Sequence, residues 1–257
     1  MENLINLNSY NTGNTLDLVD GSELLKKGKK IKAQDKYIID NLLERGLNLL
    51  VGEPKSGKTF LGQYLAEMIA HSSAKHKLKI FGNTVFPGKV LYISTETTLA
   101  ELGSRFAKYK QKASKNIKYC YETSPTYSDI ENFLITSIRG GWIHNSDNVL
   151  IVIDSLKDFD FSFCDFPKPL DINNFQDVSK IMKRFSELSD RYNCSFLFQH
   201  HLNKNNNSDP LQRIMGSQGF KASVHCMLGI ERESLNTYTL AVMRSFYCPK
   251  RLQNNEK

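Results

Sequence analysis

Short apolar runs alternate with amphipathic stretches along most of the chain. Four runs have the length and aliphatic content of buried strands, at 46–51, 89–94, 148–154 and 195–200. The run NVLIVID is continuous rather than alternating, which favours a strand covered by helices on both faces. Strands that alternate with helices predict an α/β fold with a mostly parallel central sheet.

The segments between these runs carry apolar side chains at the i, i+3, i+4 spacing of a helix face. They predict helices around 61–69, 99–106, 130–138 and 178–188. Two of these helices have a capping-box pattern at their start, Thr98 with Glu101 and Ser128 with Glu131. Shorter apolar runs predict an edge strand and two closing strands, at 117–122, 225–230 and 237–244.

The chain has 257 residues, enough for one large domain with a full core. The alternating pattern occupies residues 37–247, which we assign to this domain. Residues 1–36 are polar and then lysine-rich, and we interpret them as an N-terminal extension that is flexible or docks on a neighbouring subunit. Residues 248–257 are interpreted as a polar C-terminal tail.

Composition and charge narrow the class of protein. No apolar run is long enough to span a membrane, and the polar N-terminus is unlike a signal peptide. Five scattered cysteines without a CxxC pair indicate buried free thiols in a reducing cytosol, so we expect a cytoplasmic protein. The net charge is +7, with lysines concentrated at 26–36 and 105–118, which would suit either nucleic-acid binding or a solvated surface.

The stretch GEPKSGKT at 52–59 has the chemistry of a phosphate-binding loop. Gly52 and Gly57 let backbone N–H groups approach an anion closely. Lys58 can reach the β- and γ-phosphates of a nucleotide, and the Thr59 hydroxyl can ligate Mg²⁺. A strand precedes the stretch and a helix follows it, as the motif requires, whereas the competing interpretation is an accidental Gly-Lys turn. The nucleotide-binding segment is therefore assigned to Gly52, Glu53, Pro54, Lys55, Ser56, Gly57, Lys58, Thr59 and Phe60.

Two of the predicted strands end in carboxylates. Asp154 ends NVLIVID and is expected to coordinate Mg²⁺, directly or through water, unless it only caps the next turn. Glu96 ends VLYISTE and is a candidate general base that orients water, unless it is only an acid at a helix N-terminus. Because the carboxyl ends of parallel strands meet at one edge of a sheet, both are expected beside the P-loop. Asp158 and Asp160 are interpreted as loop residues.

The fourth strand ends in Gln199, His200 and His201. A polar group here can report whether the γ-phosphate is present and can move the loop that follows. Paired histidines also suggest a metal site, but no carboxylate or cysteine stands at ligand spacing from them, which argues against zinc.

The order of these motifs resembles the RecA-type P-loop ATPase superfamily. The P-loop, VLYISTE, VLIVIDSL and FQHHLNK follow one another as in that superfamily, and the resemblance covers about residues 37–247. YIIDNLLERGLNLLVGEPKSGKT and RIMGSQGF are most similar to the branch of RepA-like hexameric replicative helicases and related single-domain ATPases. The P-loop and the acid strand place only the superfamily, whereas Glu96 together with HHLNK is more discriminating.

The resemblance implies ATP and Mg²⁺ as cofactors and a sheet of strand order 5-1-4-3-2, with the nucleotide between subunits. It implies that Lys58 and Thr59 bind phosphate and Mg²⁺, and that Asp154 is the Mg²⁺ partner on the acid strand. Glu96 would be the catalytic glutamate. The sensor maps to His201 rather than to its neighbour.

Rings of this type also insert a basic finger into the neighbouring site from a late strand. The matching stretch LAVMRSFYC makes Arg244 the candidate, unless it is only an exposed residue of a terminal strand. Members often carry a second basic or polar residue two positions later, where this chain has Phe246.

In these rings the loops after the third and fourth strands contact nucleic acid in a central channel. Here they would be 157–173 and 203–218. The second contains Lys204 and Arg213. The first is acidic, which would repel phosphates, although its phenylalanines could stack on bases: Phe159, Phe161 and Phe163.

The leading hypothesis is a Mg²⁺-dependent ATPase that acts on single-stranded DNA in replication as a hexameric helicase or translocase. One alternative is a DNA-associated regulatory or recombination-accessory ATPase that does not unwind DNA. Another is a nucleotide-gated binding module with negligible turnover, against which Glu96 argues.

Overall fold

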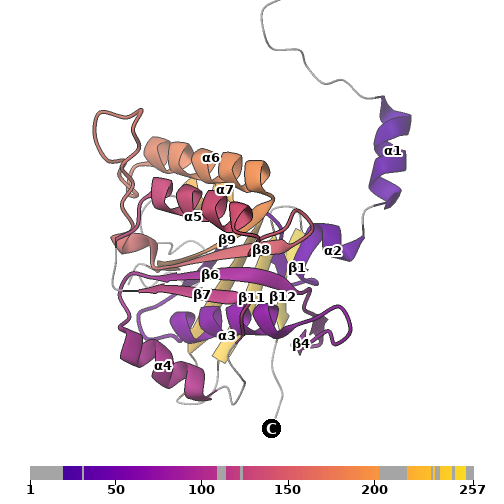
Figure 1. Cartoon of the computed structure of the whole chain (residues 1–257), viewed down its shortest axis with the longest axis horizontal. Coiled ribbons are helices and arrows are strands. Elements are labelled where there is room, and N and C mark those ends of the chain that lie inside the picture. Colours follow the sequence, from indigo (N-terminus) through magenta and orange to yellow (C-terminus); the bar gives the residue numbers. More distant parts are fainter. Residues whose placement is uncertain are drawn as a thin grey trace, which may run out of the picture. The chain divides into compact units, whose positions relative to one another are not determined.

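The structure is a computed structural model (Figure 1) that describes residues 20–30, 32–108, 114–121, 124–202, 219–232, 234, 238–244 and 247–252. The chain divides into two units, Met1–Lys32 and Ala33–Lys257. In the first unit Gly21–Lys30 forms helix α1, whose start is stabilised by the Asp20 carboxylate, an acceptor for the N–H groups of Ser22 and Glu23. Part of the predicted extension is therefore helical.

An eight-stranded sheet forms the centre of the second unit. Its strand order is β12-β11-β10-β3-β9-β8-β6-β7. The strands are β3 (Leu47–Gly52), β6 (Gly88–Ser94), β7 (Ile117–Tyr121), β8 (Asn148–Asp154), β9 (Cys194–His201), β10 (Cys226–Arg232), β11 (Tyr238–Arg244) and β12 (Tyr247–Leu252). The segment β10-β3-β9-β8-β6 is parallel throughout and matches the expected order 5-1-4-3-2. The predicted edge strand β7 and closing strand β11 are present, and β12 extends the sheet antiparallel into residues assigned to the tail.

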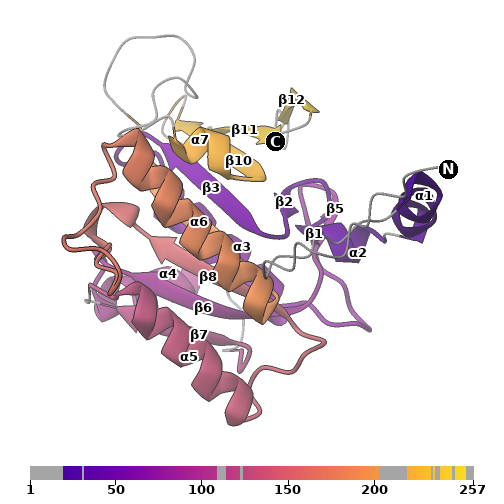
Figure 2. The same ribbon diagram turned by 90° about the horizontal axis from the view of Figure 1, so that it is seen from above.

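Helices cover both faces of this sheet (Figures 1 and 2). Helices α3 (Lys58–His71) and α4 (Leu99–Lys108) lie on one side, and α5 (Tyr127–Arg139) and α6 (Phe175–Tyr192) lie on the other. The short elements are α2 (Ala33–Lys36), β1 (Tyr37–Ile39), β2 (Leu43–Glu44), β4 (Lys79–Ile80), β5 (Asn83–Thr84), η1 (Leu156–Asp158) and α7 (Gly219–Ser223). No helix in the described part of the chain is long and apolar enough to cross a membrane.

The strands bury side chains on both faces, as the continuous run NVLIVID predicts. Ile151 and Ile153 belong to the core beneath α5 and α6, whereas Leu150 and Val152 belong to the core beneath α3. Helix α3 is enclosed on more than the one predicted face, because its polar residues Gln63 and Glu67 are also buried. The central strands are thus held from both sides, which fixes the position of their carboxyl ends.

One predicted capping box is confirmed and the other is wrong. At α4 the Thr98 N–H donates to Glu101 Oε2, and the Glu101 N–H donates to Thr98 Oγ1. The N-cap of helix α5 is instead Thr126, two residues before the predicted Ser128, and Thr126 and Asp129 form the box. The Glu131 carboxylate instead accepts a hydrogen bond from Arg191 Nη1 at 2.7 Å.

The expectation that aromatic side chains of segment 157–173 could stack on bases is wrong in this conformation. Phe159, Phe161 and Phe163 are only 5–8% exposed and belong to the core beneath α5 and α6. The Phe163 ring lies 5.3 Å from that of Tyr127, and the Phe159 ring lies 5.8 Å from that of Phe185. Burying three large apolar rings is more favourable than exposing them to solvent, so the core position is the stable one.

Candidate nucleotide-binding site

The P-loop lies between the end of β3 and the start of α3. Lys55 and Gly57 both have positive φ, 65° and 93°, a backbone conformation that turns neighbouring N–H groups toward one centre. Gly52 has no room for a side chain, because a Cβ there would lie 2.5 Å from Ser56 Oγ and 2.7 Å from the Ile230 carbonyl oxygen. The Ser56 hydroxyl is buried without a hydrogen-bond partner among the described residues. The loop is thus shaped as an anion cradle.

Lys58 begins α3 and its side chain folds back over the loop. Its ammonium donates to the carbonyl oxygens of Gly52 at 2.9 Å and Glu53 at 2.8 Å. Burial lowers the pKa of Lys58 to about 8, against the raising effect of nearby carboxylates that include Asp154 and Glu96. A phosphate in the cradle would restore a full charge partner to this ammonium.

Asp154 faces Thr59 across the loop. The Thr59 hydroxyl lies 3.3 Å from Asp154 Oδ1, and the Tyr92 hydroxyl donates to Asp154 Oδ2 at 2.7 Å. Burial raises the pKa of the Asp154 carboxyl, and these two hydrogen bonds oppose that rise. A hydroxyl and a carboxylate at this separation are the oxygen donors that Mg²⁺ prefers, so the residues fit the metal that the P-loop implies.

Glu96 follows β6 on the same edge of the sheet. Its Oε1 accepts a hydrogen bond from the Ser155 hydroxyl at 3.1 Å, directly after Asp154 in the chain. Partial burial raises the pKa of Glu96, and a hydrogen bond with Asp158 acts in the same direction. Asp158, interpreted from the sequence as a loop residue, is therefore a neighbour of the predicted base.

The histidines of β9 point to opposite faces of the sheet. His201 pairs in register with Gly52, and burial lowers the pKa of its imidazole, as do Lys58 and Lys157. His200 is buried with its ring 5.1 Å from that of Phe220. Neighbouring strand residues cannot chelate one ion from opposite faces of a sheet. Among the described residues, no cluster of three metal-ligating side chains occurs.

Two further predicted residues are Phe60, which the structure describes, and Arg244, which it describes only as part of a strand. Phe60 is 47% exposed beside the P-loop, at the start of α3. Arg244 is the last residue of β11, and its side chain is outside the described part. Phe246, Lys204 and Arg213 also lie outside the described residues.

Comparisons with known proteins identify the family and the fold. The model of a protein family described as AAA domain matches residues 17–207.

The chain belongs to the AAA domain family.

Among solved structures, one described as an ATPase domain is similar with a TM-score of 0.63 and 14% identity, over 91% of this chain and 95% of that chain. A DnaB-like replicative helicase, solved to show its interactions with primase, is similar with a TM-score of 0.57 and 13% identity, over 81% of this chain and 56% of that chain. No curated protein sequence gave a match. At these identities, the two structures show that this AAA domain chain shares their fold.

In this AAA domain chain a cavity of about 480 Å³ lies between the P-loop and the end of β10. It is lined by Glu53, Pro54, Lys55, Ser56, Glu231 and Arg232. It could hold the part of a nucleotide that extends beyond the phosphates.

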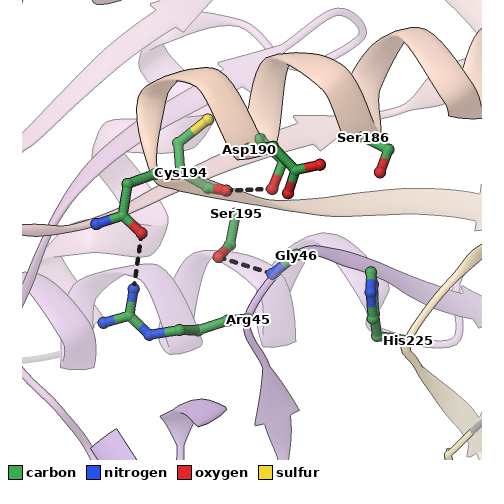
Figure 3. A pocket seen from close by; sticks show the side chains of 9 residues that line it. Arg45, Gly46, Ser186, Asp190, Cys194, Ser195 and His225 are labelled. Carbon is green, nitrogen blue, oxygen red and sulfur yellow. Dashed lines mark hydrogen bonds between the residues drawn. The ribbon is translucent and has the colours of Figure 1, made fainter. Parts of the chain in front are cut away.

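A second cavity of about 410 Å³ lies at the opposite, amino-terminal ends of the strands (Figure 3). Its polar groups bond to one another: Ser195 Oγ accepts from the Gly46 N–H at 3.0 Å, and Ser189 Oγ donates to the Cys194 carbonyl oxygen. Burial raises the pKa of Cys194 to about 12, which makes it a poor nucleophile. This cavity is separate from the P-loop edge.

Sequence reasoning missed Tyr92 and Ser155, which contact Asp154 and Glu96 respectively. A signal for Tyr92 was present: it is the one phenol within the apolar run KVLYIS, and a buried phenol needs a hydrogen-bond partner. Ser155 follows Asp154 directly and carried no comparable signal, because serine is common after strands.

Proposed function

We propose that this chain is a Mg²⁺-dependent ATPase whose nucleotide cycle drives work on single-stranded DNA in replication, as a hexameric helicase or translocase in the cytoplasm. The observation that carries the proposal is the convergence of three groups at one sheet edge. These are the Lys58 ammonium over the P-loop, the Thr59–Asp154 oxygen pair, and Glu96 held by Ser155.

In this proposal the P-loop binds the phosphates of ATP. The Lys58 ammonium exchanges the Gly52 and Glu53 carbonyl oxygens for the β- and γ-phosphate oxygens, and Ser56 supplies a further donor. Thr59 and Asp154 would hold Mg²⁺, which when bound neutralises charge on the β- and γ-phosphates.

Glu96 acts as the general base toward the attacking water. The Ser155 hydroxyl orients its carboxylate, while Asp158 favours the protonated form of the same carboxyl. His201, beside Gly52 in the sheet, is placed to sense the γ-phosphate through the neutral imidazole. Arg244 is proposed as the finger that completes a neighbouring subunit's site.

One observation favours the accessory-ATPase alternative. Channel loops of a helicase must offer contacts to DNA, but Phe159, Phe161 and Phe163 of segment 157–173 are buried. The acidic side chains of the same segment would repel phosphates. An ATPase that assembles on DNA without unwinding it does not need this loop to grip a strand.

The test is steady-state ATP hydrolysis by the purified chain, with and without single-stranded DNA, followed by strand displacement from a forked duplex. Glu96→Gln should lower kcat by roughly 10²–10⁴-fold, the usual contribution of a general base, with ATP affinity retained. Glu187→Gln is the matched control, because it makes the same change at a partly exposed position of α6, where the carboxylate lies near Arg184.

DNA-stimulated hydrolysis with strand displacement, both lost in Glu96→Gln, supports the helicase. Stimulation without displacement supports the accessory ATPase. Wild-type hydrolysis equal to that of Glu96→Gln would remove the catalytic assignment and favour a nucleotide-gated binding module.

A further inference from the structure

Tyr92 is the buried residue that connects three strands at the candidate metal site. It lies on β6, is completely enclosed, and its hydroxyl donates to Asp154 Oδ2 on β8 at 2.7 Å. The same hydroxyl accepts a hydrogen bond from Gln199 Nε2 on β9 at 3.2 Å. A phenol has one proton, and the carboxylate is the nearer and more strongly attracting acceptor than the Thr59 carbonyl oxygen at 3.4 Å.

This arrangement distinguishes the two oxygens of Asp154. Oδ2 is occupied by the Tyr92 hydroxyl, and Oδ1 is the oxygen that faces the Thr59 hydroxyl. A cation shared by Thr59 and Asp154 would therefore meet Oδ1. Mg²⁺ requires near-octahedral geometry at about 2.0–2.1 Å, so a carboxylate free to rotate would bind it less well.

Gln199 holds the Tyr92 hydroxyl from the opposite side. Its side chain is fully buried, and Gly62 of α3 leaves the room it occupies, because a Cβ at Gly62 would lie 2.2 Å from Gln199 Nε2. Gln199 is two residues before His201 and shares its face of β9. The strand that carries the candidate sensor is thus joined by two hydrogen bonds to the candidate metal carboxylate.

We propose that Tyr92 is a positioning residue for the metal site, which turns Asp154 Oδ1 toward the cation and is itself held in place by Gln199. The inference rests on the proposed function, because it needs Asp154 to bind a metal. It predicts that removal of one hydroxyl, with the ring left in place, weakens metal binding selectively.

The chain offers a matched control for this change. Tyr119 on β7 also donates its hydroxyl to a buried carboxylate, that of Glu67 in α3, and its ring lies 5.5 Å from the Tyr92 ring. Tyr119→Phe and Tyr92→Phe therefore remove the same group from the same core. Only Tyr92 contacts Asp154.

The experiment measures Mn²⁺ binding to the full chain by electron paramagnetic resonance, with a non-hydrolysable ATP analogue present. Nucleotide affinity without metal is measured in parallel in EDTA. Tyr92→Phe should weaken Mn²⁺ binding by roughly 10–100-fold, the usual effect of losing a partner of a metal ligand, and should leave affinity in EDTA unchanged. Tyr119→Phe should bind Mn²⁺ like the wild type.

Gln199→Met tests the second hydrogen bond and provides a second variant if Tyr92→Phe folds poorly. It should weaken Mn²⁺ binding by roughly 2–10-fold, the effect of one neutral hydrogen bond. Wild-type Mn²⁺ affinity in both Tyr92→Phe and Gln199→Met overturns the positioning role, as does an equal loss in Tyr92→Phe and Tyr119→Phe. A wild-type chain that binds nucleotide in EDTA but no Mn²⁺ overturns the metal assignment itself, and the positioning role with it.

Discussion

Replacement of Gly62 by alanine is expected to destabilise the fold, although alanine is the better helix former. Gly62 lies inside α3, where its missing side chain leaves space for the buried Gln199 amide. A Cβ at this position would lie 2.2 Å from Gln199 Nε2 and 3.0 Å from its Cδ. Gln199 can move away only by giving up its hydrogen bond to Tyr92.

The magnitude follows from three opposing effects. Overpacking of a filled core costs about 1–3 kcal/mol. Loss of the Gln199–Tyr92 hydrogen bond adds about 1 kcal/mol. The higher helix propensity of alanine stabilises by about 1 kcal/mol. The net loss in the free energy of unfolding is about 1–3 kcal/mol, and each kcal/mol lowers Tm by about 2–4 °C in a chain of this size.

Gly103→Ala is the matched control, because Gly103 lies inside α4 with nothing within 4 Å of its Cβ position. This variant should be more stable than wild type by about 0.5–1 kcal/mol, from helix propensity alone. Urea unfolding of both variants, followed by circular dichroism, measures the difference. If Gly62→Ala were as stable as Gly103→Ala, the packing of Gln199 against α3 would be refuted.

Three further predictions concern other parts of the second unit. Lys58→Ala should weaken ATP binding by roughly 10–150-fold, the effect of a hydrogen bond to a charged group, in a fluorescent-nucleotide titration. Burial raises the pKa of Glu67 above the ordinary 4.5, so the native state binds this proton more tightly than the unfolded state. The free energy of unfolding therefore falls as pH rises from the pKa of Glu67 in the unfolded state to its higher pKa in the native state. Glu67→Gln should remove this fall in urea unfolding measured across pH. Phe185→Ala should cost about 3–5 kcal/mol in the same assay, because its buried ring lies within 5.8 Å of those of three other phenylalanines.

The parallel core of the fold could be predicted because its signals are local. A continuous apolar run specifies a strand covered on both faces, and NVLIVID coincides with β8 from Asn148 to Asp154. The order of the five central strands followed from resemblance rather than from periodicity. The start of α5 was mispredicted because two capping-box patterns overlap there, Thr126 with Asp129 and Ser128 with Glu131, and the structure forms the first.

The candidate site was predicted where residue type alone indicates chemistry. A lysine after a glycine-rich turn and carboxylates after buried strands are visible in one sequence, and the structure brings Lys58, Asp154 and Glu96 to one edge. Segment 157–173 was misjudged because aromatic side chains in a loop suit either a ligand or the core. Whether these side chains are buried depends on how the loop packs against helices far away in the sequence, and a single sequence does not contain that information.

A comparison of the two buried tyrosine–carboxylate pairs supports our proposal of Asp154, and not Glu67, as the carboxylate for a cation. Glu67 has a partner that can become cationic, since its Oε2 lies 3.3 Å from His71 Nδ1, and its Oε1 accepts from Tyr119. The Asp154 carboxylate accepts hydrogen bonds from hydroxyls, and the cations Arg105 and Lys58 act on it electrostatically rather than through a hydrogen bond. Burial still raises the pKa of the Asp154 carboxyl, so these hydroxyls and cations offset only part of the cost of burying its charge. Because Asp154 lies at the carboxyl edge of the sheet beside the P-loop, a divalent cation that arrives with the nucleotide can supply the missing charge.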